Sequence, residues 1–152
     1  MSGVQHVLAR FPLGVYIVGS AHEGKINGMT AAWVTQVSFS PKMVAVAIAP
    51  ERYTFELVSR SGKFSLSLLK EDQLELAKRF GFYSGRAEEK FSGVDYHLVD
   101  GLPVLDDCVA WVSCEVEGSC QAGDHVVFVG RVVKAKLLDD GPALLFRWED
   151  YF

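Results

Sequence analysis

The sequence has few cysteines, no long apolar run and no excess of basic residues. Its three cysteines, Cys108, Cys114 and Cys120, form no Cys-x-x-Cys pair of the kind found in zinc or thioredoxin-type sites. We interpret them as reduced thiols, with Cys108 and Cys114 as small core residues on one face of a strand. No apolar run approaches the ~20 residues of a membrane span, and His6 and Arg10 interrupt any signal core. We therefore expect a cytoplasmic protein without a membrane partner.

Several kinds of site are also missing from the pattern. The chain has 15 Lys and Arg residues against 19 Asp and Glu residues, which gives a net charge of −4, and the cations are scattered along the sequence. We therefore expect no nucleic-acid partner. No His, Asp and Glu cluster has metal-ligand spacing, and no serine or cysteine nucleophile motif occurs, so we predict neither a metal nor hydrolysis. Without a Gly-x-Gly-x-x-Gly fingerprint or a P-loop, a nicotinamide cofactor would have to bind as a diffusible substrate.

The composition fits one domain over residues 1–152 with some apolar surface to spare. The apolar share is 49% and the charged share 22%, which favours a ligand pocket or a second subunit, that is, a homodimer. The candidate aromatic residues for such a subunit boundary are Trp33, Phe146, Trp148, Tyr151 and Phe152.

The stretch from residue 27 to 41 is the most unusual part of the chain. Gly28 and the two alanines that follow Thr30 would let backbone approach a ligand closely, and hydroxyls come from Thr30, Thr35 and Ser38. Neither a helical nor a strand period continues across Trp33. Such local disagreement often marks function, so we interpret this stretch as a cofactor rim.

A candidate anion site follows directly. Residues 43–49 are wholly apolar and predict a buried strand, and Arg52-Tyr53-Thr54 then places a cation and a hydroxyl at a predicted helix start. The alternative is a solvent-exposed arginine beside a capping threonine.

The remaining pattern predicts a mostly β chain with about seven strands and three helices. It fits a closed or split antiparallel β-barrel with helices outside better than a βαβ sheet. We expect helices over residues 2–11, 53–60 and 71–80, with one apolar face on the first and Gly81 just beyond the last. We expect strands over residues 14–21, 63–69 with one buried face, 96–99, 108–116, 126–138 with a kink at Gly130, and 143–148, with turns over 22–25 and 101–103.

Residues 82–93 predict a loop that could serve as a mobile lid. Glycines would allow hinge motion, cations would suit phosphates and rings would offer stacking surfaces. These residues are Gly81, Gly85, Gly93, Arg86, Lys90, Tyr83 and Phe91. The alternative is an ordinary solvated connection.

The chain resembles the flavin reductase-like, FMN-binding split-barrel family, most of all its flavoredoxin-type branch. The likeness spans roughly residues 7–147 and consists of short motifs in the same order: Met29-Thr30-Ala31-Ala32-Trp33, Val37-Ser38-Phe39, Pro41, Arg52-Tyr53-Thr54, Ser84-Gly85-Arg86, Lys90-Phe91 and Gly123-Asp124-His125. Where many reductases of the family carry two serines after the threonine, this chain has Ala32 and Trp33, so contacts from those serines are not carried over.

The resemblance implies an FMN-binding homodimer that takes a hydride from NADH or NADPH and passes electrons to free flavin or an electron-transfer protein. It places His125 beside the nicotinamide side of the flavin, although His125 could equally be a strand residue paired with Asp124. Thr30 would offer a hydroxyl near the flavin N5 or ribityl, and Trp33 could stack on the ring or belong to the core or an interface. Expected FMN contacts are Asn27, Met29, Thr30, Ala31, Ala32, Trp33, Val34, Arg52, Tyr53, Thr54, Ser84, Gly85, Lys90 and Phe91. Two other functions remain open: an FMN electron carrier without a nicotinamide site, and a flavin-free small-molecule-binding barrel.

Overall fold

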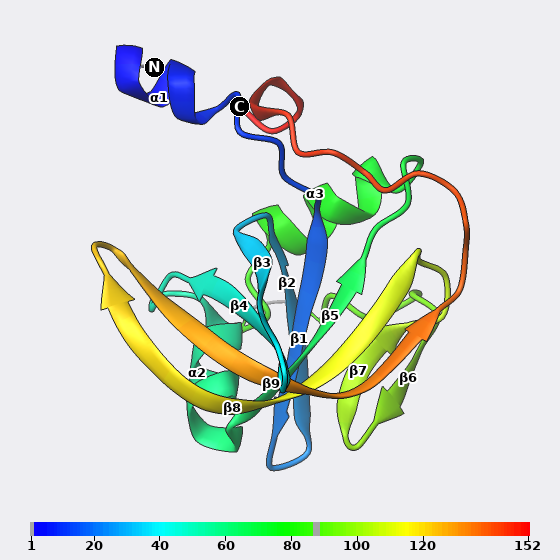
Figure 1. Cartoon of the computed structure of the whole chain (residues 1–152). Helices are drawn as coiled ribbons and strands as arrows, with labels where there is room; N and C mark the ends of the chain where they lie inside the picture. The colour runs from blue at the N-terminus through cyan, green and yellow to red at the C-terminus, as the bar shows by residue number, and fades with distance from the viewer. Residues whose placement is uncertain (1, 87–88) are drawn as a thin grey trace.

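The main element is a seven-stranded antiparallel sheet that curls into a split barrel (Figure 1). The computed structural model describes residues 2–86 and 89–152. The sheet order is β2-β1-β5-β8-β9-β4-β3. The bounds are β1 Tyr16–His22, β2 Lys25–Ala31, β3 Val34–Phe39, β4 Lys42–Ile48, β5 Lys63–Leu68, β8 Ala110–Ala122 and β9 His125–Leu137.

The split lies between β2 and β3, which follow each other in the chain but stand at opposite ends of the sheet order. Only Ala32 and Trp33 connect them, which is the point where the sequence period fails. Edge strands leave backbone N–H and C=O groups without ladder partners, so this opening can receive a ligand. The predicted barrel fold is confirmed.

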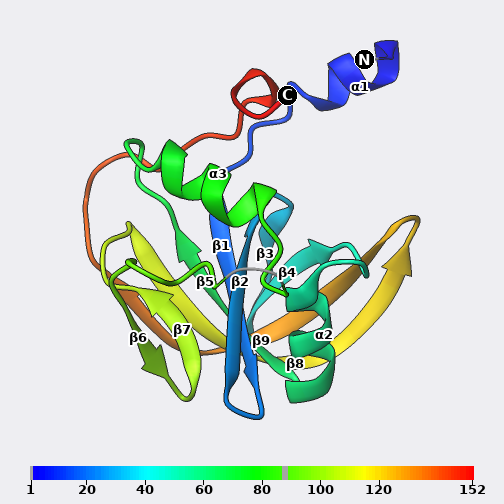
Figure 2. The same cartoon turned by 180° about the vertical axis from the view of Figure 1, so that it is seen from behind.

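Two helices pack against the barrel near this opening (Figure 2). α2 (Tyr53–Ser61) covers β1, and α3 (Leu74–Phe82) lies against β2. α3 approaches β2 closely because residue 28 has no side chain: a Cβ at Gly28 would lie 3.1 Å from the Phe80 ring.

The first helix has no partner within the described part of the chain. α1 (Gly3–Leu8) begins at Ser2, whose Oγ accepts a hydrogen bond from the Gln5 backbone N–H at 3.2 Å, as a helix cap should. It stands away from the barrel in both views, and its connection to β1 runs beside the C-terminal turn (Figures 1 and 2). The predicted apolar face is therefore solvent-exposed, with Val4 72%, Val7 62% and Phe11 60% exposed.

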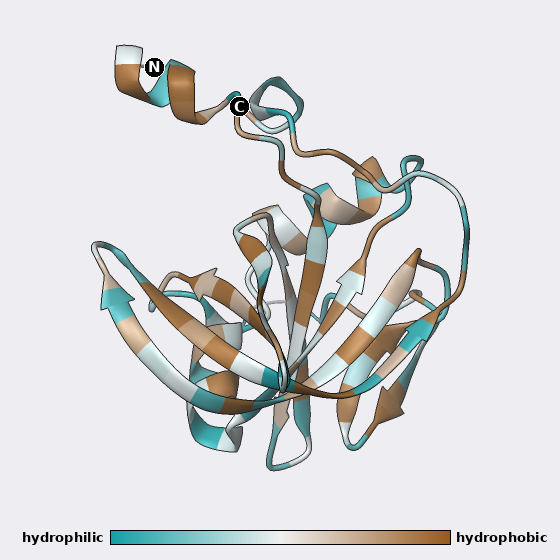
Figure 3. Cartoon of the chain, in the orientation of Figure 1, coloured by the Kyte–Doolittle hydropathy of each residue, from teal (hydrophilic) through white to brown (hydrophobic). Residues whose placement is uncertain are grey.

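The interior consists of two apolar clusters. One fills the barrel around Phe64, Val46 and Ile48, and the other lies around Phe80 and Trp111. Along the long strands, apolar and polar bands alternate, as expected for strands with two different faces (Figure 3).

A small second sheet corrects two predictions. β6 (Tyr96–Val99) pairs with β7 (Leu102–Leu105), so residues 102–103 belong to a strand and only Asp100 and Gly101 turn the chain. This hairpin packs on β5, where Ser65 Oγ donates to the Pro103 carbonyl at 2.6 Å. Both faces of β5 are therefore buried, and the prediction of one buried face is wrong.

Four other element predictions need correction. The third helix begins later than expected and continues through Gly81 to Phe82, so Gly81 does not end it. Residues 143–148 form only isolated bridges, at Ala143 and Leu145, followed by a 3₁₀ turn over Trp148–Asp150. The strand predicted over 108–116 begins at Ala110 and reaches Ala122. Of the predicted strand 43–49, residues 43–48 lie on β4 (Lys42–Ile48), and only the alternate positions Val46 and Ile48 are buried.

The cysteine and glycine predictions are partly confirmed. Cys108 and Cys114 are buried free thiols, but Cys108 precedes β8 and belongs to the other apolar cluster. At Gly130 a Cβ would lie 2.6 Å from Phe64, and the β8–β9 register shifts between Val116 and Gly118, where Val116 faces Gly130. The extra residue of this bulge is Glu117 on β8, so the ladder is irregular beside Gly130, but a kink of the glycine's own strand stays a prediction.

Candidate functional site

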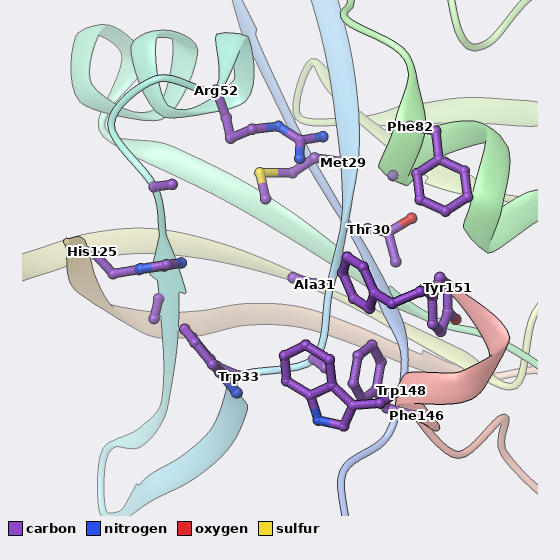
Figure 4. A pocket seen from close by; sticks show the side chains of 15 residues that line it. Met29, Thr30, Ala31, Trp33, Arg52, Phe82, His125, Phe146, Trp148 and Tyr151 are labelled. Atoms are coloured by element: carbon purple, nitrogen blue, oxygen red, sulfur yellow. The ribbon is translucent and has the colours of Figure 1, made fainter. Parts of the chain in front are cut away.

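A pocket opens where the barrel is split (Figure 4). Its volume is about 280 Å³. One wall is the rim of the barrel, and the opposite wall comes from the end of α3 and the C-terminal segment. The lining residues are Met29, Thr30, Ala31, Ala32, Trp33, Ala47, Ala49, Arg52, Gly81, Phe82, His125, Phe146, Trp148, Tyr151 and Phe152.

The rim wall is made of small side chains held by the sheet. Ala31 ends β2, Ala32 follows it, and Ala47 on β4 lines the same wall. The backbone here is fixed, since Tyr16 pairs with Ala31 across the ladder and Ala47 N–H donates to the Trp33 carbonyl at 3.1 Å. Small side chains on a fixed backbone form a flat surface, which suits a planar ring.

Trp33 and His125 form one edge of the pocket. Their ring centroids are 4.8 Å apart, and Trp33 is 51% exposed, so it is not a core residue. His125 Nδ1 lies 2.8 Å from Asp124 Oδ1. This hydrogen bond and the charge of His125 lower the pKa of the Asp124 carboxyl, which stays anionic and orients the imidazole. The two readings of His125 are thus compatible: it pairs with Asp124 and also lines the pocket.

Thr30 lines the pocket, but its hydroxyl is already engaged. Thr30 Oγ1 donates to the Ala77 carbonyl of α3 at 2.5 Å. The hydroxyl therefore ties β2 to α3, and only its remaining acceptor capacity is open to a ligand.

A second, polar hollow of about 230 Å³ adjoins the first and shares Arg52, Gly81 and Phe82 with it. Five more of the predicted contact residues line this hollow: Asn27, Tyr53, Ser84, Gly85 and Lys90. The contact residues predicted from the sequence therefore lie in two adjoining chambers, one apolar and one polar.

Two cations converge at the polar hollow. Arg52 Nη2 donates to the Phe80 carbonyl at 3.3 Å, and Lys90 Nζ donates to the same oxygen at 2.9 Å and to the Gly28 carbonyl at 3.0 Å. Neither cation pairs with a carboxylate among the residues that the structure describes. Burial, and then the charge of Arg52, lower the pKa of Lys90 to about 8. Glu51 also lines the hollow but pairs with neither of them. A partly buried arginine and a buried lysine that form no ion pair favour binding of an anion.

The loop that carries Lys90 differs from the predicted lid. Lys90 is only 2% exposed, and the Arg79 guanidinium holds the carbonyls of Lys90 and Ser92 at 2.9 and 3.0 Å. Arg86 lies over the Tyr53 ring at 5.0 Å and pairs with Glu56. Residues 87–88 of the predicted lid lie outside the described residues. The part from Lys90 onward is anchored and does not form a surface for a ligand to stack on.

Three predicted contact residues lie elsewhere. Thr54 is fully buried, and its Oγ1 accepts from Asn27 Nδ2 at 2.9 Å. Phe91 is a core residue whose ring lies 4.9 Å from Phe80. Val34 lines a separate groove. Burial takes the side chains of Thr54 and Phe91 out of both chambers. Val34, which was expected to contribute backbone groups, has its side chain in the separate groove. Flavin contacts from these three residues stay predictions.

The aromatic wall was missed as part of the site. Phe146, Trp148, Tyr151 and Phe152 were expected at a subunit boundary, yet they line the pocket, as does Phe82. The signal available in the sequence was the cluster of four aromatics in seven residues, which indicated a binding surface without indicating what it faces.

Two negative observations apply to residues 2–86 and 89–152. No group of three or more His, Cys, Asp or Glu side chains there could hold a metal ion. Within the same residues, no helix has both the length and the apolar character that crossing a membrane requires.

Comparison with known proteins agrees with this geometry. The model of the flavin reductase like domain matches residues 8–152. A flavin reductase of Pseudomonas putida is 35% identical over 92% of this chain and 82% of its own length, and the NADH-dependent flavin reductase StyB of Pseudomonas fluorescens is 34% identical over 84% and 74%. The solved structure of the NADH:FAD oxidoreductase SgcE6 of Streptomyces globisporus superposes with a TM-score of 0.88 at 27% identity, covering 95% of this chain and 87% of that one.

Proposed function

The chain belongs to the flavin reductase-like family, and we propose that it is an NAD(P)H-dependent oxidoreductase that holds its flavin at the split of the barrel. The main support for this proposal is that the apolar pocket and the polar hollow adjoin each other. A flat apolar pocket and a hollow with two cations, neither of which forms an ion pair within the described residues, meet at Arg52, Gly81 and Phe82. A flavin nucleotide has the same two parts, a planar apolar ring system and an anionic phosphate.

The polar hollow would hold the phosphate end. Arg52 and Lys90 would exchange their contacts with the Phe80 carbonyl for charge-assisted hydrogen bonds to phosphate oxygens. The hollow is also lined by Tyr53, the first residue of α2, so the N-terminus of that helix adds its partial positive charge. Asn27 and Ser84 would supply neutral polar contacts to the chain between phosphate and ring.

The rim would hold the ring system. β2 is an edge strand, so backbone groups from Met29 to Ala32 can pair with the polar edge of a flavin, and Ala31, Ala32 and Ala47 leave room for its flat face. Since Ala32 and Trp33 replace the family's two serines, the contacts at these positions are made by backbone.

When bound, the flavin supplies the electron-accepting chemistry of hydride transfer. The protein's contribution is position and electrostatics. Thr30, tied to α3 through Ala77, fixes the end of β2 against the helix. His125, oriented by Asp124, offers one ring nitrogen as a hydrogen-bonding group at the edge of the pocket.

We further propose FMN as the preferred flavin, because one pair of cations suits a single terminal phosphate.

A homodimer is the second proposal, since α1 exposes an apolar face. Sedimentation at micromolar concentration should give twice the monomer mass, and shortening the apolar face by Val4→Ser and Val7→Ser should shift the protein toward monomer. A wild-type monomer that binds FMN stoichiometrically would refute the homodimer.

The proposed function is tested in two steps. FMN is first titrated into the purified protein, and saturable binding with one flavin per chain is expected. NADH or NADPH is then added without oxygen, with free flavin as the acceptor. Reduction that depends on the protein is expected of the enzyme. Bound FMN that NAD(P)H leaves oxidised would instead indicate an electron carrier, and absence of flavin binding would indicate a flavin-free barrel.

A further inference from the structure

Within the described residues, every hydrogen bond of the Arg79 side chain goes to the backbone of one turn. Arg79 lies on α3, and its Nε donates to the Lys90 carbonyl at 2.9 Å. Its Nη2 donates to the carbonyls of Ser92 at 3.0 Å and Glu89 at 3.4 Å. Arg79 forms no ion pair in the part of the chain that the structure describes. Its planar fork therefore fixes the shape of a turn instead of neutralising a carboxylate.

Two of these carbonyls depend on Arg79. The Glu89 carbonyl also accepts from the Ser92 N–H at 3.3 Å, whereas the carbonyls of Lys90 and Ser92 accept from Arg79 alone among the described residues. Lys90 is only 2% exposed, so little water reaches its backbone. A buried carbonyl without a donor is unfavourable. Without the guanidinium, this turn should rearrange until the Lys90 carbonyl reaches water.

Helix α3 contacts Lys90 at both ends of that residue. Arg79 binds the Lys90 carbonyl, and the carbonyl of the next helix residue, Phe80, accepts from Lys90 Nζ at 2.9 Å. The same Nζ donates to the Gly28 carbonyl at 3.0 Å. The Phe80 ring also lies 4.9 Å from the ring of Phe91, which follows Lys90. Two consecutive helix residues thus hold two consecutive turn residues, and the position of the turn decides where the lysine side chain enters the polar hollow.

The lysine side chain itself is flexible and needs such support. Its charge sits at the end of a four-carbon stem, and ordering a stem of this kind when a ligand binds lowers the affinity. The Phe80 carbonyl belongs to the last turn of α3, where the helix carries partial negative charge that attracts the ammonium. With its backbone anchored by Arg79, Lys90 reaches this carbonyl before any ligand is present, so part of the ordering cost is already met.

We propose that Arg79 is a positioning residue that holds the turn over residues 89–92, so that the Lys90 ammonium stands in the polar hollow ready for an anion. This inference rests on the proposed function, which places the flavin phosphate in that hollow. Arg79 lines neither chamber, so its effect on phosphate binding passes through Lys90.

The first test compares the binding of FMN with that of riboflavin, which has no phosphate. Arg79→Met removes the fork and Arg79→Lys keeps only the charge. Lys78→Met is the matched control, because it removes a cation from the neighbouring helix position, which pairs with Glu75 at 3.9 Å and makes no hydrogen bond to the turn among the described residues. We expect FMN binding to weaken about fivefold or more in Arg79→Met and about threefold or more in Arg79→Lys, and to stay within about twofold in Lys78→Met. Riboflavin should bind all of these proteins within about twofold of wild type.

A double-mutant cycle tests whether the effect passes through Lys90. FMN affinity is measured for Arg79→Met, Lys90→Met and the double variant. If Arg79 acts through Lys90, adding Arg79→Met to Lys90→Met should change FMN affinity by less than about twofold. A residue that only stabilised the fold would show no such dependence on Lys90.

Four results would overturn the inference. Equal weakening of FMN and riboflavin in Arg79→Met would give Arg79 a purely structural role, and wild-type FMN binding by Arg79→Lys would make charge sufficient without the fork. An undiminished effect of Arg79→Met in the Lys90→Met background would show that Lys90 is not involved. Unchanged FMN binding in Arg79→Met would show that the turn needs no anchor. Wild-type protein that binds no FMN, or binds it no more tightly than riboflavin, would instead refute the proposed function and its phosphate site.

Discussion

The two walls of the pocket differ in how they are held. The rim is part of the hydrogen-bonded sheet, with Met29 and Ala31 buried and paired across the ladder to β1. The C-terminal wall is fixed by ring contacts and local turns, and Phe152 at its end is 84% exposed. A pocket with one rigid side and one yielding side can keep a cofactor in a constant position while a second molecule enters and leaves.

The comparison also separates stability from function. The polar hollow belongs to the rigid side, because Arg52 and Lys90 both bind the Phe80 carbonyl at the core of the α3 contact. Changes on that side should affect folding and flavin binding strongly. Changes in the wall should leave folding nearly intact.

The largest expected effect is on the rigid side. Phe80 is fully buried and contacts Phe91 and the space left by Gly28. Phe80→Ala should lower the free energy of unfolding by about 3–5 kcal/mol, while Tyr151→Ala should cost about 1 kcal/mol, the value of one aromatic contact. Denaturant unfolding followed by circular dichroism measures both. Equal losses in the two variants would remove the distinction between the walls.

Next in size is the phosphate contact. Arg52→Met removes one charge-assisted hydrogen-bond donor and should weaken FMN binding by about tenfold or more, corresponding to ~1.5–3 kcal/mol. Arg60→Met is a suitable control, because Arg60 lies on α2, the helix that Arg52 precedes, pairs with Glu56 and does not line either chamber. If the two variants give the same FMN binding isotherm, the phosphate does not bind at Arg52.

A smaller effect concerns pH. The pKa of Lys90 is lowered to about 8, so the free protein loses this charge as the pH rises through that value. A bound phosphate favours the ammonium form and raises the pKa in the complex. The complex therefore holds more protons than the free protein above pH 8, and FMN affinity should fall there by up to about tenfold per pH unit. The Lys90→Met variant should bind FMN more weakly, and its FMN affinity should not change with pH above pH 7. If its FMN affinity falls with pH as steeply as that of wild type, the titrating group is not Lys90.

The fold was largely predictable because strand periods, glycine turns and helix ends are local signals. β6 was identified with its correct bounds, and α2 began at Tyr53 as predicted. β7 was missed because Gly101-Leu102-Pro103 has the composition of a turn, while its strand pairing is decided by packing on Ser65. Residues 143–148 are apolar enough for a strand, but they form only single bridges, from Leu145 to Gly14 before β1 and from Ala143 to Lys70 after β5.

The site was predictable where its chemistry is concentrated in short motifs. Met29 to Trp33, Arg52 and His125 could be found in this way, and the structure brings them to one opening. A motif does not reveal burial: Thr54 and Phe91 both match the resemblance, and both side chains are enclosed by neighbouring elements. The aromatic wall could not be assigned to the pocket from the sequence, because its position depends on the path that the chain takes after β9.

The most direct test of the central claim compares FMN with riboflavin, which has the same ring and lacks the phosphate. The ratio of their dissociation constants is measured for wild type and for the double variant Arg52→Met/Lys90→Met. We predict that wild type prefers FMN by at least about tenfold and that the double variant binds both flavins nearly equally, with riboflavin affinity unchanged. A double variant that keeps the wild-type preference for FMN would contradict the assignment of the two chambers.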